Sequence, residues 1–198
     1  MEKINCSICN SSDYENYSKI VNSEFSINKE FDLVRCNSCN FIYLNPRISQ
    51  KKINKYYKSD YNPHKYKNYF FTVIQSIMFR WKRYIIESFV KNGRLLDIGS
   101  GTNSFIQYMN KNNWKADSYD NFTNSTIESI DSCNENYYDV ITLWHSLEHI
   151  HNIDDIFFKI KELLKPNGIL IVACPNIESI DCKLLGTNWV AYDVPRHL

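Results

Sequence analysis

Four cysteines in two pairs carry the most specific chemistry in this sequence. The pairs are Cys6–Cys9 and Cys36–Cys39, both C-x-x-C, and a long loop separates them. Zn²⁺ favours four soft ligands in a tetrahedron, and two such turns supply two thiolates each. Asn10 and Asn40 follow the pairs, where asparagine tolerates the left-handed backbone that often ends such a turn. We therefore predict a structural zinc site, because four thiolates leave no coordination position open. Metal-free, disulfide and redox interpretations are the alternatives, and the redox one is disfavoured because neither pair opens a helix after a strand.

A second group combines acids with flexible glycines. Asp97 precedes Gly99, Ser100 and Gly101 at the point where an apolar strand enters a helix. Glycines let the backbone approach a ligand closely, and a helix N-terminus offers free N–H groups. A dinucleotide fingerprint would have glycine where Ser104 stands. An acid before the first glycine instead suits a ligand with a cationic amino group, such as the methionine end of S-adenosylmethionine.

Asp120 follows the glycine loop at the end of the next expected strand. An acid in this position can accept hydrogen bonds from both hydroxyls of a ribose. The alternative is a solvated turn residue. Together with Asp97 and the glycine loop, Asp120 predicts a binding site for an adenosyl ligand.

A third group follows the apolar segment 138–144, at the edge where parallel sheets bind ligands. Trp144 can line an adenine pocket. His145 and His149 lie close to it in the sequence, His197 lies near the end of the chain, and each is a candidate general base. A histidine that serves packing or a hinge is the alternative. Arg196 is a candidate for binding a phosphate, or else a surface ion pair.

The elements that must position these residues alternate between strands and helices from residue 94 onward. We expect strands at 94–98, 114–119, 138–144 and 169–174, and helices at 103–111 and 154–165. Such alternation implies parallel strands joined by right-handed crossovers. The sequence therefore predicts an α/β fold with a Rossmann-like, mostly parallel sheet and flanking helices, preceded by a small zinc-binding β module.

Three stretches are expected along the chain. They are a zinc-binding module at 1–50, a helical connector at 51–91 and the Rossmann-like domain at 92–198. Within the connector, apolar side chains recur with the helical period, and we expect this stripe to pack against a core. Its members are Phe70, Val73, Ile74, Ile77, Trp81, Tyr84, Ile85 and Ser88.

Composition narrows the range of partners and locations. The net charge of +1 argues against a nucleic-acid partner. The most apolar stretch, 68–79, is too short to span a bilayer, and the segment 1–10 lacks the apolar core of a secretory signal. Unpaired cysteines beside a metal motif are typical of a reducing compartment, so we predict a cytoplasmic protein.

These motifs in this order resemble class I S-adenosylmethionine-dependent methyltransferases. More narrowly, they resemble a bacterial subgroup with an N-terminal zinc-binding domain that includes sugar C-methyltransferases. The segments are CNSCNFIYLNPR (36–47), LLDIGSG (95–101), YDVITLWHSLEHI (138–150), LKPNGILIVACPN (164–176) and the stretch 188–198. The resemblance implies S-adenosylmethionine as cofactor and a small-molecule acceptor, such as a nucleotide-linked sugar in surface polysaccharide or deoxysugar biosynthesis.

The sequence departs from this family pattern at three places. Asn103 replaces the third glycine, and the segment 121–137 is short where the family has a helix, a strand and an adenine contact. Asp131 is the acid placed to substitute for that contact. The sequence ends at Leu198, where relatives continue, which would leave 169–174 as an apolar edge strand. That edge has three interpretations: the sequence is a fragment, it is a truncated product, or homodimerisation completes the sheet. The alternative function is that of a non-catalytic zinc-binding relative.

Overall fold

The computed structural model describes residues 1–21, 29–57, 69–120 and 135–198. These residues form two compact units. The Rossmann-like unit contains the described residues of 69–147 and 155–174, and the cysteine unit contains those of 1–57, 148–154 and 175–198. Both units are discontinuous in sequence, whereas the expected boundaries at residues 50 and 91 divide the chain into consecutive stretches. Those domain boundaries stay a prediction.

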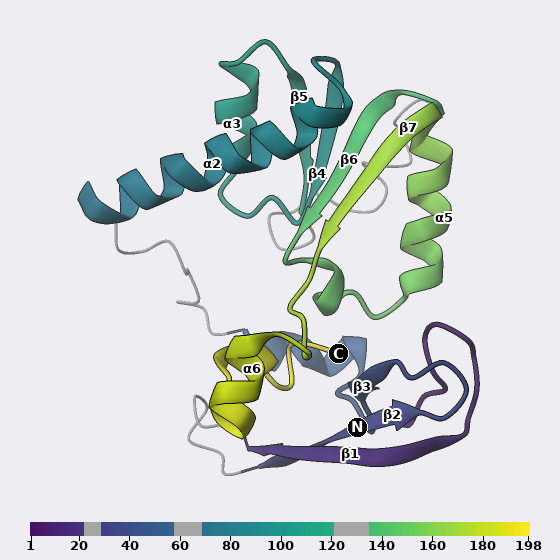
Figure 1. The fold of residues 1–198 in the computed structure, drawn as a ribbon. Coiled ribbons are helices and arrows are strands. Elements are labelled where there is room, and N and C mark those ends of the chain that lie inside the picture. Colours follow the sequence, from purple (N-terminus) through teal and green to yellow (C-terminus); the bar gives the residue numbers. More distant parts are fainter. Residues whose placement is uncertain (22–28, 58–68, 121–134) are drawn as a thin grey trace. The chain divides into compact units, whose positions relative to one another are not determined.

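A four-stranded sheet forms the centre of the Rossmann-like unit (Figure 1). The strands are β4 (Arg94–Ile98), β5 (Lys115–Tyr119), β6 (Tyr138–Trp144) and β7 (Leu164–Ala173). They lie in the order β5-β4-β6-β7, and every neighbouring pair is parallel. The α/β prediction is therefore confirmed, and two of the strands, 94–98 and 138–144, have the expected bounds.

Helices cover both faces of this sheet (Figure 1). They are α2 (Tyr69–Phe89) and α3 (Ser104–Asn110) on one side and α5 (Ile153–Leu163) on the other. The core on the α2 and α3 side consists of Ile86, Leu95, Phe105, Ile106, Met109, Trp114, Ala116, Val140 and Trp144. Because alternate residues of a strand face opposite sides of a sheet, Leu95 enters this core while Leu96 is buried on the other face.

The junction between α5 and β7 differs from the prediction by a few residues. The helix ends at Leu163 rather than at residue 165, and the backbone N–H groups of Asn136 and Tyr137 bond the carbonyls of Glu162 and Leu163 in its last turn. Leu164 pairs with Tyr138 of β6, so β7 begins directly after the helix. The segment 165–168 then bulges out of register, since Tyr138 pairs with Leu164 and Val140 with Ile169.

Helix α2 exposes most of the apolar stripe that the sequence assigned to a core. Phe70, Ile77 and Tyr84 are 71%, 57% and 74% exposed, whereas Ile86 is fully buried. Phe79 and Ile85 also pack against the core. The expectation is wrong for most of the stripe, because periodicity identifies an apolar face but not the face that a short sheet can cover.

Strand β7 is one of the two edge strands of the sheet formed by the described residues, and β5 is the other. Val172 in this strand is 39% exposed. None of the described helices has both the length and the hydropathy needed to cross a membrane.

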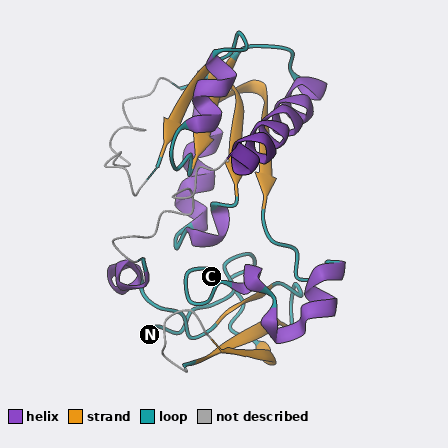
Figure 2. Ribbon diagram, turned by 90° about the vertical axis from the view of Figure 1, so that its left-hand side faces the viewer, coloured by secondary structure: helices purple, strands orange, loops and turns teal. Residues whose placement is uncertain are grey.

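The cysteine unit is built on a three-stranded antiparallel sheet (Figure 2). Its strands are β1 (Tyr14–Val21), β2 (Glu30–Cys36) and β3 (Ile42–Leu44), in the order β1-β2-β3. The short helices are α1 (Gln50–Ile53), η1 (Asn54–Tyr56), α6 (Ile180–Leu185), η3 (Gly186–Asn188) and η4 (Val190–Tyr192). Val194 joins a core with Phe31 and Leu44, so the end of the chain packs on the N-terminal sheet.

Candidate functional site

Asp97 lies buried near the carboxyl end of β4, in the middle of the sheet. Its side chain is 4% exposed, and the Thr142 hydroxyl on the neighbouring strand donates a 2.7 Å hydrogen bond to its Oδ1. Burial raises the pKa of the Asp97 carboxyl to about 6, although the Thr142 bond and the positive charge of Lys82 act in the opposite direction. A cation placed beside this carboxylate would relieve its desolvation, so Asp97 suits the amino group of a ligand.

The glycine loop is held between the ends of β4 and β5. The Gly101 N–H donates a 2.7 Å hydrogen bond to Asp120 Oδ2, and Gly99 N–H donates to Tyr119 O at 2.7 Å. Asp120 is buried rather than a solvated turn residue. The Ser100 hydroxyl donates to Asn103 Oδ1 at 2.7 Å. The structure thus brings Asp97, Gly99, Ser100, Gly101 and Asp120 together at the carboxyl ends of β4 and β5.

The two glycines are required for different reasons. Gly99 has φ +82°, and a Cβ there would lie 2.3 Å from the Cβ of Ser146. Gly101 has φ +55°, and a Cβ there would meet no atom within 4 Å. The first glycine allows a close internal contact, and the second faces open space. Asn103 also adopts a left-handed conformation, with φ 59°, which explains how the family's third glycine can be replaced.

Lys82 is a site residue that sequence reasoning missed. It lies on α2, with its ammonium 4.8 Å from the ring centroid of Trp144 and 5.2 Å from that of Phe105. Burial lowers the pKa of Lys82, and the negative charge of Asp97 opposes that shift. The sequence offered no signal for it, because Lys82 stands beside other basic residues on one long helix.

Trp144 lies at the end of β6 and packs within the core under α2 and α3. Its ring is 6.1 Å from that of Trp81. The indole Nε1–H is buried and has no hydrogen-bond partner among the residues that the structure describes. Its expected place in an adenine pocket stays a prediction. Asp131, the other expected adenine contact, lies outside the described residues.

Two of the three candidate bases meet in the cysteine unit. The rings of His149 and His197 are 4.7 Å apart between centroids and meet edge to face. Tyr57 Oη lies 3.1 Å from His149 Nδ1, and Glu148 belongs to the same cluster. Burial and then the positive charge of His197 lower the pKa of His149. Tyr57 was missed because it is far away in the sequence and carries no motif.

The other polar candidates occupy different environments. His145 is exposed, has φ 55°, and belongs to the Rossmann-like unit rather than to this cluster. Arg196 is 4% exposed and pairs with Asp193, to which its Nε donates at 2.8 Å. Of the two interpretations of Arg196, the ion pair is therefore the one that the structure contains, although the pair is buried rather than at the surface.

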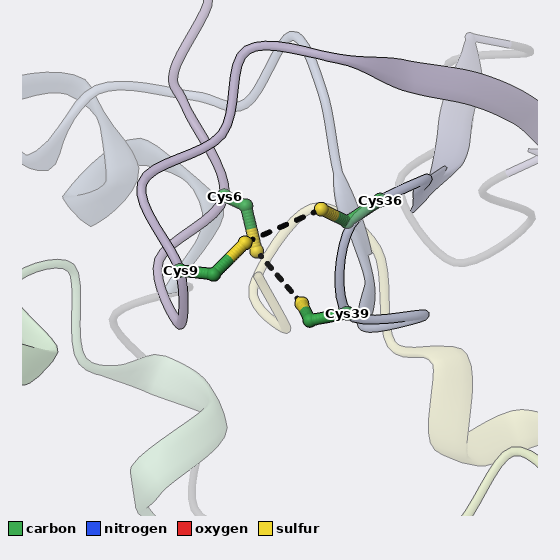
Figure 3. A group of neighbouring side chains, drawn as sticks. All are labelled: Cys6, Cys9, Cys36 and Cys39. Atoms are coloured by element: carbon green, nitrogen blue, oxygen red, sulfur yellow. Dashed lines mark hydrogen bonds between the residues drawn. The ribbon is translucent and has the colours of Figure 1, made fainter.

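The four cysteines converge from two turns of the cysteine unit (Figure 3). Their Sγ atoms lie within 4.8 Å of one another, and the pairs Cys6–Cys39 and Cys9–Cys36 are each 3.5 Å apart. Thiolates at the corners of a zinc tetrahedron are about 3.8 Å apart, given Zn–S bonds of about 2.3 Å. The donor set and its spacing therefore fit Zn²⁺.

Backbone hydrogen bonds close both cysteine turns. Asn10 and Asn40 have φ 59° and 63°, which confirms the expected left-handed turns. Their N–H groups bond the carbonyls of Cys6 and Cys36 at 2.8 and 2.9 Å. Burial opposes ionisation of Cys36, but hydrogen bonds from the backbone of Ser38 and Cys39 and from the Cys9 and Cys39 side chains outweigh it and lower the pKa of the Cys36 thiol to about 6. A hydrogen bond from the backbone of Phe41 lowers the pKa of Cys39, but burial and contacts with the other three thiols outweigh it and raise that pKa to about 12, so one thiol of the cluster ionises at the expense of another.

Comparisons with known proteins identify a family for this chain. The model of a methyltransferase domain family matches residues 70–198. Ubiquinone biosynthesis O-methyltransferases from two strains of Rickettsia bellii are 30% identical over 77 residues, which is 39% of this chain and 30% of those proteins. The matched segment thus covers less than a third of these relatives.

Two solved structures were also found to be similar. A SAM-dependent methyltransferase from Archaeoglobus fulgidus has a TM-score of 0.46 and 20% identity over 66% of each chain. Phosphoethanolamine N-methyltransferase 2 from Haemonchus contortus, solved with S-adenosyl-L-methionine, has a TM-score of 0.37 and 16% identity over 55% of this chain and 32% of that one.

The family match covers well over half of the chain, and the parallel sheet with its glycine loop lies within it. This chain belongs to the methyltransferase domain family. The resemblance to methyltransferases is therefore confirmed at the level of the family. The narrower resemblance to zinc-containing sugar C-methyltransferases stays a prediction.

Proposed function

We propose that this protein binds S-adenosylmethionine on the Rossmann-like unit and transfers its methyl group to a small molecule. The arrangement of Asp97 and Asp120 around the glycine loop carries the proposal. Asp97 is a buried carboxylate with a raised pKa, and Gly101, which donates to Asp120, faces open space. Such a site favours a ligand that brings its own positive charge.

Each residue of the loop has a role in this proposal. Asp97 would hold the cationic amino group, and Asp120 would accept hydrogen bonds from the ribose hydroxyls. Gly99, Ser100 and Gly101 would let the backbone approach the ligand. Trp144 would contact the adenine, as would Asp131. The bound cofactor supplies an electrophilic methyl group on a sulfonium.

The acceptor must be aligned with that methyl group, and it needs a base if its nucleophile carries a proton. His145, His149 and His197 are the candidates for this base. The resemblance favours a nucleotide-linked sugar as acceptor. The buried Arg196–Asp193 pair removes one candidate phosphate ligand from that hypothesis. The Rickettsia relatives favour a hydroxyl acceptor instead, because their names describe O-methyltransferases.

Titration calorimetry with S-adenosylmethionine and its demethylated product tests the proposal. We expect binding of both by the intact, zinc-loaded protein, and strongly weakened binding by Asp97→Asn. Absence of binding by the wild type would refute the proposal. Label transfer from methyl-labelled cofactor to nucleotide-sugars and to hydroxylated aromatics then separates the two acceptor classes. Binding without transfer to any acceptor would favour the non-catalytic alternative.

We further propose that Cys6, Cys9, Cys36 and Cys39 bind a structural Zn²⁺. The clustering of their Sγ atoms within 4.8 Å supports this site. A reduced four-thiolate centre is compatible with the cytoplasm. A homodimer that covers the β7 edge stays a prediction, and light scattering of the purified protein tests it.

A further inference from the structure

We propose that Glu148, His149 and His197 form a second metal site, separate from the four cysteines, for a divalent transition-metal ion such as Zn²⁺. One nitrogen from each imidazole and one oxygen of the carboxylate lie within 4.8 Å of one another. All three residues belong to the cysteine unit, although His149 and His197 are far apart in the sequence. The inference does not depend on the proposed methyl transfer.

Both imidazoles are held in the way that metal-binding histidines usually are. His149 Nδ1 lies 3.2 Å from the backbone oxygen of Arg196, and His197 Nδ1 lies 2.8 Å from that of Ala191. A carbonyl oxygen can only accept, so a hydrogen on each Nδ1 satisfies both contacts, and in this tautomer the Tyr57 hydroxyl, 3.1 Å from His149 Nδ1, acts as a second acceptor there. The proposed site uses this tautomer, in which the lone pair of each imidazole is on Nε2. A metal-ligating histidine commonly donates its other ring N–H to a carbonyl in this manner, which fixes the ring and its tautomer.

The backbone fixes the two ligand segments against each other. The Leu198 N–H donates a 3.0 Å hydrogen bond to Glu148 O, directly linking the segments that carry the ligands. The His197 N–H donates to Asp193 O at 3.2 Å, which closes the turn before this ligand. Val194 within that turn is buried in the core of the unit. The ligands are therefore arranged by packing before any ion binds.

The donor set indicates the class of ion. Two imidazoles and one carboxylate favour Zn²⁺ and related transition metals, whereas Ca²⁺ and Mg²⁺ favour oxygen donors throughout. Three protein ligands leave a coordination position open for water or for an oxygen of another molecule. Asp193 Oδ2 lies 3.7 Å from His197 Nε2 and is near enough to balance the charge of an ion there.

This site changes the assignment of the base. An ion bound by His149 and His197 occupies the lone pairs that a general base would need. Within the proposed function, His145 would then be the remaining histidine candidate for the base.

Titration of the reduced, metal-free protein with Co²⁺ tests the proposal. The thiolate site gives intense sulfur-to-metal charge-transfer bands, whereas a site with imidazole and carboxylate gives only weak d–d absorption. We expect both the charge-transfer bands and the weak d–d absorption. The titration should bind one ion per chain at the thiolate site, reported by the charge-transfer bands, and one further ion that adds nothing to those bands. Mass-spectrometric metal analysis after zinc loading and gel filtration should agree.

Three variants decide whether the extra ion occupies this cluster. Glu148→Gln keeps the shape of the side chain, and His197→Ala removes a ligand. Each should weaken binding of the extra ion by at least about 100-fold while leaving the charge-transfer bands intact, which also reports that the unit is folded. His145→Ala, outside the cluster, should keep both ions. An ion content accounted for by thiolates alone in the wild type, or an extra ion that survives in Glu148→Gln and His197→Ala, would overturn the proposal.

Discussion

Replacing Asp97 by asparagine should make the protein more stable and weaken its binding of cofactor. The pKa of this carboxyl is raised from 3.8 to about 6, because the side chain is buried. This difference in pKa corresponds to roughly 3 kcal/mol of folding free energy lost when the group ionises at pH 7. Asparagine is neutral, and its Oδ1 can still accept the hydrogen bond from Thr142.

The free energy of unfolding that Asp97→Asn gains should be larger at pH 7 than at pH 5. Since the folded-state pKa of Asp97 is higher than the unfolded one, its contribution to stability is complete below about pH 4 and is lost as the pH rises through 6. The variant should therefore gain about 1–3 kcal/mol at pH 7, reduced from the full value because Lys82 loses a neighbouring negative charge. At pH 5 the gain should fall to roughly half.

Cofactor binding should move in the opposite direction. Loss of a charged partner for the amino group should weaken S-adenosylmethionine binding by roughly 10- to 100-fold in Asp97→Asn. In the wild type, affinity should fall roughly tenfold from pH 7 to pH 5, as the carboxylate with a pKa of about 6 becomes protonated. This decrease should be absent from the variant.

Urea unfolding at pH 5 and pH 7, followed by circular dichroism, measures the stability of both proteins. Calorimetric titration at the same pH values measures the affinity. Thr142→Val provides a matched control, because it removes the hydrogen bond to Asp97 but leaves the acid. A variant that is less stable than the wild type at pH 7, or that binds the cofactor equally well, would refute this account of Asp97.

Three further predictions concern the glycine loop, its charges and the metal. Gly99→Ala should lower the free energy of unfolding by about 2–4 kcal/mol, because the added Cβ would collide with Ser146. Gly101→Ala should lower it by about 1 kcal/mol, because only its left-handed backbone is disfavoured. Equal decreases for the two variants in urea unfolding would contradict this reasoning. Lys82→Met should raise the pH midpoint of cofactor binding, because Lys82 lowers the pKa of the Asp97 carboxyl. Calorimetry at several pH values measures this midpoint, and a lower midpoint in the variant would contradict the reasoning. Chelation of zinc should speed hydrogen exchange in the antiparallel sheet, and unchanged exchange there would exclude a structural metal.

The sequence by itself determined the features that depend on short-range constraints. The strands at 94–98 and 138–144 were predicted to the residue, because short apolar runs bounded by turn residues leave few alternatives. The left-handed Asn10 and Asn40 were also predicted, since each follows a C-x-x-C turn whose geometry depends on neighbouring residues. The acid-and-glycine loop could be recognised for the same reason.

The tertiary structure decided which distant groups meet. It placed Lys82 beside Asp97, covered Ile86 while leaving Phe70 and Tyr84 exposed, and brought His197 to His149. None of these contacts has a signal in local spacing, because each depends on the packing of elements far apart in the chain. A sequence pattern determines which side chains lie on each face of a helix or strand, and the surface available for packing decides which of those faces is buried.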